Sequence, residues 1–253
     1  MGHLLTKIGF SIGLLLALGF AVSAQAERSR VFSSAGQSTQ LLELFTSQGC
    51  SSCPPADRWL TQWKQKPELW SQLIPVAFHV DYWDWMGWRD RFATKDFGER
   101  QRLYKKEGAV RSVYTPGFVV DGQEWRGWFD GKPLPATAPK QGTLSATIKR
   151  HRIQLQYQPE LTPGNSTGTK RDWVVHVTLL GFDLQTPVQR GENSDRTLQE
   201  DFVVIWYQRA MADGAWTFTL PEPSTLPTDD FGFAAWVTSG TSNTPLQVVG
   251  GKL

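Results

Sequence analysis

Apolar positions in the first half of the chain alternate between strand-like and helix-like spacing. Residues 41–45 and 73–81 are short, nearly continuous apolar runs, as is typical of strands buried on both faces of a parallel sheet. Between them, the apolar residues of 54–65 fall on one face at spacings of three and four, which indicates a helix. The order strand, helix, strand predicts a βαβ unit.

A second helix and another strand are predicted next along the chain. Asp90 is a suitable N-cap for a helix that ends near Glu107, with Gly108 as its stop. The apolar run 113–122 follows and has Pro116 at its entry, where proline suits a cis peptide bond or an edge strand. The pattern up to this point is therefore that of an α/β region.

The pattern changes after a proline-rich stretch at 133–142. Strand-like segments separated by turn-rich links are 143–150, 153–158, 173–180, 202–209, 216–220, 231–238 and 246–249. We therefore expect an α/β domain at 38–132, a linker at 133–142, and an all-β, sandwich-like domain at 143–253.

The first 26 residues have the pattern of an export leader. A weakly basic start precedes the apolar run 8–22, and Ala24 and Ala26 are the small residues that a signal peptidase needs. The apolar run is shorter than the roughly 20 residues that span a membrane. We expect cleavage after Ala26, no stable membrane anchor, and a periplasmic or secreted location.

Composition favours a globular protein and argues against nucleic-acid binding. The chain is 40% hydrophobic and 20% charged, and its net charge is +2. Such a small charge provides no electrostatic footprint for nucleic acid. The 12 tryptophans predict buried aromatic clusters or an aromatic-lined groove.

The chain has two cysteines, Cys50 and Cys53, in a CxxC arrangement. Exported proteins that use disulfides as staples usually carry more cysteines, spread to close long loops. A bridge across so short a loop stabilises by only about 2 kcal/mol, against nearly 5 for a loop of about 100 residues. Two thiols beside a helix start exchange disulfides readily, so the pair is better suited to redox chemistry.

A CxxC after a first core strand, with Thr115-Pro116 at the start of a later one, resembles the thioredoxin superfamily. A closer resemblance, to an uncharacterised family of secreted bacterial proteins with a thioredoxin-like domain, rests on residues 43–57, 78–84, 113–116 and 190–193. The resemblance implies a thioredoxin-like fold for 38–132. It also implies Cys50 as the attacking cysteine, Cys53 as the resolving one, and Pro116 as a cis-proline after Thr115, which lines a substrate groove.

Consecutive prolines indicate where the first helix begins. If Cys50 were the N-cap, Pro54 and Pro55 would occupy helical positions whose N–H groups should be hydrogen-bonded. A start near Cys53 removes this conflict and leaves Cys50 just before the helix, within reach of its dipole. We expect Cys50 to be the more exposed and more acidic thiol, and Cys53 the more buried one.

Two further groups of polar residues are candidates for the site. His79 and Asp81 lie at the end of a predicted strand, on the same sheet edge as the CxxC, where they either assist proton transfer at Cys53 or bond to neighbouring loops. The segment 190–193 either lines a groove between the two domains or is an ordinary charged turn.

These observations predict an exported thiol-disulfide oxidoreductase without a cofactor or resident metal. Its partners are thiols or disulfides of proteins or small molecules. The competing class is a binding protein. It is either a copper carrier that uses both thiols and perhaps His79, or a peptide or carbohydrate binder that uses the Trp-rich surface and keeps the cysteines as a dormant clip.

Overall fold

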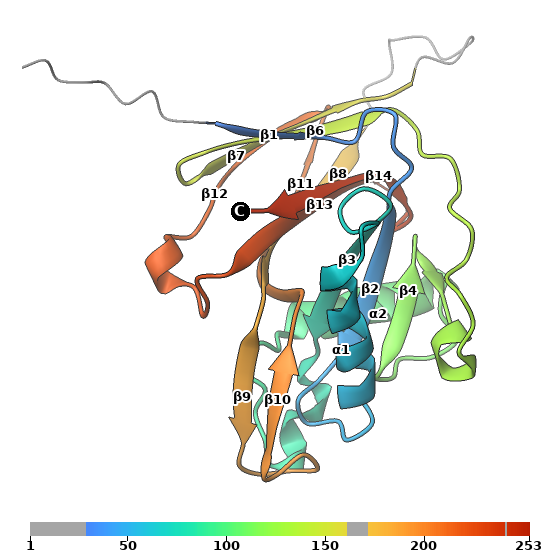
Figure 1. The fold of residues 1–253 in the computed structure, drawn as a ribbon. Coiled ribbons are helices and arrows are strands. Elements are labelled where there is room, and N and C mark those ends of the chain that lie inside the picture. The colour runs from blue at the N-terminus through green and yellow to red at the C-terminus, as the bar shows by residue number, and fades with distance from the viewer. Residues whose placement is uncertain (1–28, 161–171, 241) are drawn as a thin grey trace, which may run out of the picture.

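The computed structural model describes residues 29–160, 172–240 and 242–253 and contains 43% strand against 17% helix. Eight strands form one mixed sheet: β2 (Gln40–Thr46), β3 (Leu73–His79), β4 (Gly117–Val120), β5 (Gln123–Glu124), β8 (Trp173–Gly181), β11 (Val203–Ala212), β13 (Phe231–Ser239) and β14 (Pro245–Lys252). Their spatial order is β14-β13-β8-β11-β3-β2-β4-β5. This sheet is the framework of the molecule (Figure 1).

A four-stranded antiparallel sheet packs against the β13–β14 end of the large sheet (Figure 1). Its order is β1 (Arg30–Ser33), β6 (Thr143–Lys149), β7 (Arg152–Gln158) and β12 (Ala215–Thr219). In β7, the apolar residues Ile153, Leu155 and Tyr157 alternate with exposed polar ones, so one face joins the core and the other meets solvent.

A separate hairpin, β9 (Leu184–Val188) and β10 (Arg196–Glu200), projects beside the first helix (Figure 1). The sequence patterns did not predict it. Its inward residues, which include Leu184, Val188 and Leu198, are buried, and its alternate residues are exposed. The hairpin thus covers the region where β2 ends.

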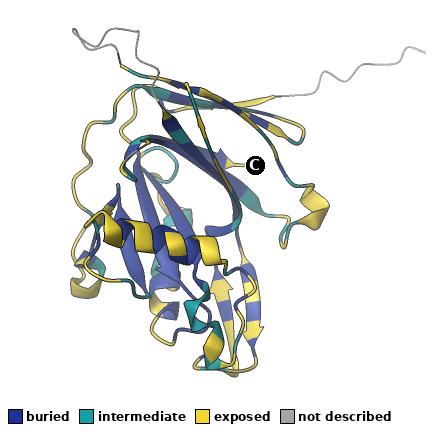
Figure 2. Ribbon diagram, turned by 180° about the vertical axis from the view of Figure 1, so that it is seen from behind, coloured by how far each residue is buried: buried dark blue, intermediate teal, exposed yellow. Residues whose placement is uncertain are grey.

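Two α-helices, α1 (Pro54–Thr61) and α2 (Lys95–Lys106), lie on opposite faces of the large sheet (Figures 1 and 2). The short 3-10 helices are η1 (Gln62–Gln65), η2 (Asp81–Met86), η3 (Gly127–Asp130) and η4 (Pro223–Thr225). Cys53 is the N-cap of α1, and Pro54 and Pro55 occupy its first two positions, where no intrahelical N–H bond is needed. The predicted helix start near Cys53 is confirmed.

The predicted fold class, an α/β thioredoxin-like domain followed by an all-β sandwich-like domain, is wrong. The chain has more than twice as much strand as helix, and β3 pairs in parallel with β11 on one edge and with β2 on the other. Strands from both sides of the proline-rich stretch therefore share one sheet. The pattern of a strand predicts its buried faces but not the neighbour that its backbone pairs with.

The predicted boundaries 38–132, 133–142 and 143–253 stay predictions. The predicted leader, 1–26, lies outside the described residues. Within the part of the chain that the structure describes, no helix is long and apolar enough to span a membrane.

A buried ion pair ties α2 to the centre of the large sheet. Arg100 Nε lies 2.6 Å from Glu43 Oε2, and the Tyr104 hydroxyl also donates to the Glu43 carboxylate. The Arg100 guanidinium lies 5.3 Å from the Phe78 ring centroid and 5.1 Å from that of Trp236. The core on the α2 face of the sheet is thus built around one satisfied charge pair.

Candidate functional site

Both cysteines lie where β2 ends and α1 begins. The connecting loop makes two successive turns, in which Cys50 N donates to Ser47 O at 3.1 Å and Cys53 N donates to Cys50 O at 3.2 Å. The parallel strands β2 and β3 end at this same edge of the sheet. The loop therefore meets the residues that follow β3, as the sequence predicts for the surroundings of the CxxC.

The sulfur of Cys50 faces the predicted substrate-binding residues. Cys50 Sγ lies 3.8 Å from the Thr115 carbonyl oxygen and 3.3 Å from Ser52 Oγ. The Thr115–Pro116 peptide bond is cis, as predicted. The fold thus brings the thiol loop and the start of β4 together across 65 residues of sequence.

Neither cysteine is exposed in this conformation. Cys50 and Cys53 both have 0% exposed surface. The expectation that Cys50 is the more exposed of the two thiols is therefore wrong. It considered only the place of Cys50 before the helix, whereas Ser52 and Thr115 lie against its sulfur.

The two thiols have opposite acidity. The hydrogen bond from Cys53 lowers the pKa of Cys50 to about 6, helped by Ser52 and Thr115 and opposed by burial. Burial raises the pKa of Cys53 well above its ordinary value, as do the hydrogen bond to Cys50 and the charge of Asp57. At neutral pH the pair thus holds one thiolate and one thiol.

A buried carboxylate, Asp57, lies near the thiols and was missed in the sequence. Thr46 Oγ1 donates to Asp57 Oδ1 at 2.8 Å. Burial raises the pKa of Asp57 to about 7, and the charge of Glu200 adds to this rise. Sequence spacing could have revealed it, because Asp57 follows Cys53 by four residues and therefore lies on the same face of the helix.

Of the two proton-transfer candidates, His79 is the one near the thiol loop. His79 Nδ1 lies 2.7 Å from Asp90 Oδ2, which also accepts a hydrogen bond from Gln48 N at 2.8 Å. Burial opposes the positive charge of His79, but Asp90 and then Glu200 raise its pKa to about 9. His79 Nε2 has no hydrogen-bond partner among the described residues.

The side chain of Asp81 lies away from the thiol loop, against α2. A Cβ added at Gly98 of α2 would be 3.2 Å from Asp81 Oδ1. The structure therefore places His79 in the network behind the thiol loop and Asp81 against α2.

The β9–β10 hairpin holds the thiol loop from the other side. Asn193, which is fully buried, donates from Nδ2 to the carbonyl oxygens of Gln48 and Cys50, both at 2.9 Å. The carboxylate of Glu192 accepts from Ser51 N at 3.0 Å. The segment 190–193 thus contacts the CxxC loop directly, which an ordinary charged turn does not explain.

Gln48 joins the loop to the same hairpin through its side chain. Its Nε2 donates to Glu200 Oε2 at 2.8 Å and to Thr186 Oγ1 at 3.0 Å, and its Oε1 accepts from Trp88 Nε1 at 3.1 Å. Every polar group of this buried side chain is used, as a rigid loop requires.

A protein-family profile described as "Protein of unknown function (DUF1223)" matches residues 41–238. The chain belongs to this family. The match supports the predicted uncharacterised family and indicates no thioredoxin family.

Two solved structures are similar to this member of the family. A crystal structure of a protein from Agrobacterium tumefaciens aligns with a TM-score of 0.57 and 24% identity, over 85% of this chain and 93% of that one, which indicates a shared fold. HBP35 of Porphyromonas gingivalis aligns with a TM-score of 0.49 and 14% identity, over 86% of this chain and 76% of that one. No curated protein matches the chain.

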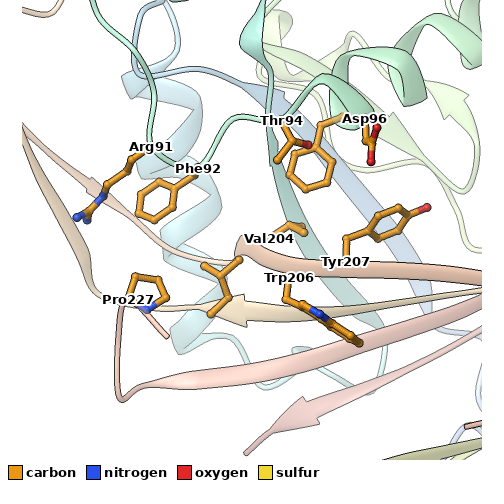
Figure 3. Close-up of a pocket in the computed structure, with 10 residues that line it drawn as sticks. Arg91, Phe92, Thr94, Asp96, Val204, Trp206, Tyr207 and Pro227 are labelled. Atoms are coloured by element: carbon orange, nitrogen blue, oxygen red, sulfur yellow. The ribbon is translucent and has the colours of Figure 1, made fainter. Parts of the chain in front are cut away.

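A cavity of about 390 Å³ lies between β11 and the loop that leads into α2 (Figure 3). The rings of Phe92, Trp206 and Tyr207 are among its walls, and neither cysteine lines it. Phe92 separates it from the buried network, because its ring centroid lies 5.5 Å from that of His79. Among the residues described, no three His, Cys, Asp or Glu side chains are grouped to hold a metal ion.

Replacing Asp57 by Asn is expected to remove a pH-dependent loss of stability. An acid whose pKa rises on folding, here from 3.8 to about 7, binds more protons in the folded state, so stability falls as the pH rises through that window. Asn keeps an acceptor for Thr46. At pH 8, Asp57→Asn should exceed the wild type in free energy of unfolding by up to about 4 kcal/mol.

Urea unfolding between pH 4 and 8 measures this effect. Asp96→Asn is the matched control, because Asp96 is exposed, and it should leave the pH slope unchanged. An equal decline in Asp57→Asn and the wild type would contradict the assignment.

Proposed function

We propose that this protein is a thiol-disulfide oxidoreductase that acts through Cys50 and Cys53. The observation that carries the proposal is the pairing of an acidic thiol with a strongly non-acidic one beside the Thr115 backbone. An attacking cysteine must be ionised at neutral pH, and a resolving cysteine must keep its proton until it is needed. A disulfide that served only as a staple would need neither property.

The reaction consists of two exchanges. The Cys50 thiolate attacks one sulfur of a substrate disulfide, forms a mixed disulfide and releases the first substrate sulfur as a thiolate, which takes up a proton. Cys53 then loses its proton and attacks Cys50 Sγ, which releases the second substrate sulfur. Two electrons pass to the substrate and the protein is left with a Cys50–Cys53 disulfide. The reverse sequence oxidises a substrate dithiol.

The proposed substrates are protein or small-molecule disulfides and dithiols. The Thr115 carbonyl lies 3.8 Å from Cys50 Sγ, so an extended chain that pairs with the backbone here brings its own sulfur to Cys50. Pro116 follows directly and has no N–H to offer. No organic cofactor is needed, because the electrons stay on sulfur throughout.

The proposal includes export from the cytoplasm. It is supported by the leader-like pattern of residues 1–26 and by the persistence of reactive disulfides in oxidising compartments.

The equilibrium reduction potential of the Cys50–Cys53 pair tests the proposal. Catalytic pairs lie between about −120 and −270 mV, and inert structural disulfides lie below about −300 mV. We expect a value in the first range, measured by alkylation and mass spectrometry in defined thiol buffers. A value in the second range would favour the dormant clip, and a dithiol that Cu(I) keeps reduced would favour the copper carrier.

A further inference from the structure

The segment that follows β3 lies beside the cysteine loop. This segment is η2, and its Trp83 contacts the loop at Gly49. A Cβ added at Gly49, next to Cys50, would lie only 3.0 Å from Trp83 Cβ. At its other end, Trp83 Nε1 donates to Thr115 Oγ1 at 2.8 Å. Trp83 thus reaches from the cysteine loop to the residue whose carbonyl faces Cys50 Sγ.

Tyr82 of the same segment contacts α2. Its hydroxyl donates to Gln101 Oε1 on α2 at 3.0 Å. Burial raises the pKa of the Tyr82 hydroxyl, and the charges of Cys53 and Cys50 add to this rise. Tyr82 and Trp83 therefore connect α2, the Thr115 side chain and the cysteine loop, beside two cysteines that have 0% exposed surface.

Tyr82 and Trp83 of η2 pack against the core as partly buried residues, but the segment is less buried than β3, every residue of which is buried. No residue of η2 is fully buried, and Trp85 is 80% exposed. The segment ends at Gly87, whose φ of 97° is in the left-handed region and which has no neighbour within 4 Å in the space that a Cβ would take. Segments with little buried surface open at a lower free-energy cost than core strands do.

We propose that η2 is a lid over the thiol pair, that the Trp83–Thr115 hydrogen bond is its latch, and that an extended substrate chain opens it by binding at Thr115. The inference rests on the proposed function, because an exchange reaction requires direct contact between sulfurs. Thr115 is part of both the latch and the proposed substrate-binding site. A reagent that cannot pair with the Thr115 backbone therefore does not open the lid and does not reach the thiols.

The rate at which iodoacetamide alkylates Cys50 in the reduced protein tests the lid. At pH 8 this thiol, with a pKa of about 6, is ionised, so the rate reports access to the sulfur. Trp83→Phe keeps a ring but loses the N–H donor. It should react about two- to tenfold faster than the wild type, which corresponds to one hydrogen bond. Trp85→Phe is the matched control on the same segment and should react at the wild-type rate.

Thr115→Val removes the latch from its other end and should give a similar increase. The double variant Trp83→Phe/Thr115→Val should react no faster than the faster single variant, because both changes break the same bond. Circular dichroism identifies a variant that does not fold, and the other single variant then carries the test. A folded Trp83→Phe or Thr115→Val that reacts at the wild-type rate would overturn the latch, as would equal acceleration by Trp85→Phe.

Failure of the lid and failure of the proposed function are distinguishable, because alkylation requires no disulfide exchange. Faster alkylation of Trp83→Phe together with a reduction potential below about −300 mV would leave the lid in place and remove the oxidoreductase. A potential in the catalytic range with unchanged alkylation would remove the lid alone.

Discussion

Cys53→Ser is expected to accumulate mixed disulfides with partner proteins, and Cys50→Ser is expected to accumulate none. The hydrogen bond from Cys53 is the largest cause of the lowered pKa of Cys50, and the serine hydroxyl can donate in its place. Ser52 and Thr115 also lower this pKa, so Cys50 still attacks in Cys53→Ser. Without the second sulfur the mixed disulfide is not resolved and persists. In Cys50→Ser, the remaining thiol has a raised pKa and is too weakly ionised to attack.

Trapping is measured by quenching cells with acid, alkylating free thiols, and comparing non-reducing with reducing gels. Cys50→Ser/Cys53→Ser is the control for disulfides that do not involve the pair. Equal trapping by both single variants would remove the division of roles. No trapping by either variant, with a stable disulfide in the wild type, would favour the dormant clip.

Glu43→Leu is expected to lower the free energy of unfolding by about 3–5 kcal/mol, the cost of leaving one member of a buried ion pair alone. Glu43 is fully buried and is the carboxylate on which Arg100 and the Tyr104 hydroxyl converge. Leu has a similar size, so the loss reports the uncompensated charge of Arg100 rather than a cavity. Urea unfolding followed by circular dichroism measures it.

The double variant Glu43→Leu/Arg100→Met is the matched control. Because it removes both charges, it should be more stable than Glu43→Leu alone, as is often found when apolar residues replace a buried pair. A loss below about 1 kcal/mol in the single variant would show that water reaches Arg100 and that the pair is not a buried one.

Local patterns in the sequence predicted most of the elements. Alternation of apolar and polar residues located β6 and β7 to within a residue or two, because each has one face in the core and one in solvent. Two successive prolines predicted the start of α1, because proline has no N–H to donate inside a helix. The thioredoxin resemblance carried by the CxxC and Thr115-Pro116 implied which residues meet at the end of β2.

The sequence by itself therefore determined most of the strands and both α-helices and where α1 begins, and its resemblance to the thioredoxin superfamily implied a cis-proline near the two thiols. Only the tertiary structure decided that β11 pairs with β3, that Asn193 holds a loop 143 residues away, and that Cys50 has no exposed surface. The spacing of apolar residues along a helix or strand shows which side faces the core, because each apolar side chain is stabilised by its own removal from water. The neighbour that covers a given side depends on contacts between distant segments, and no local pattern encodes them.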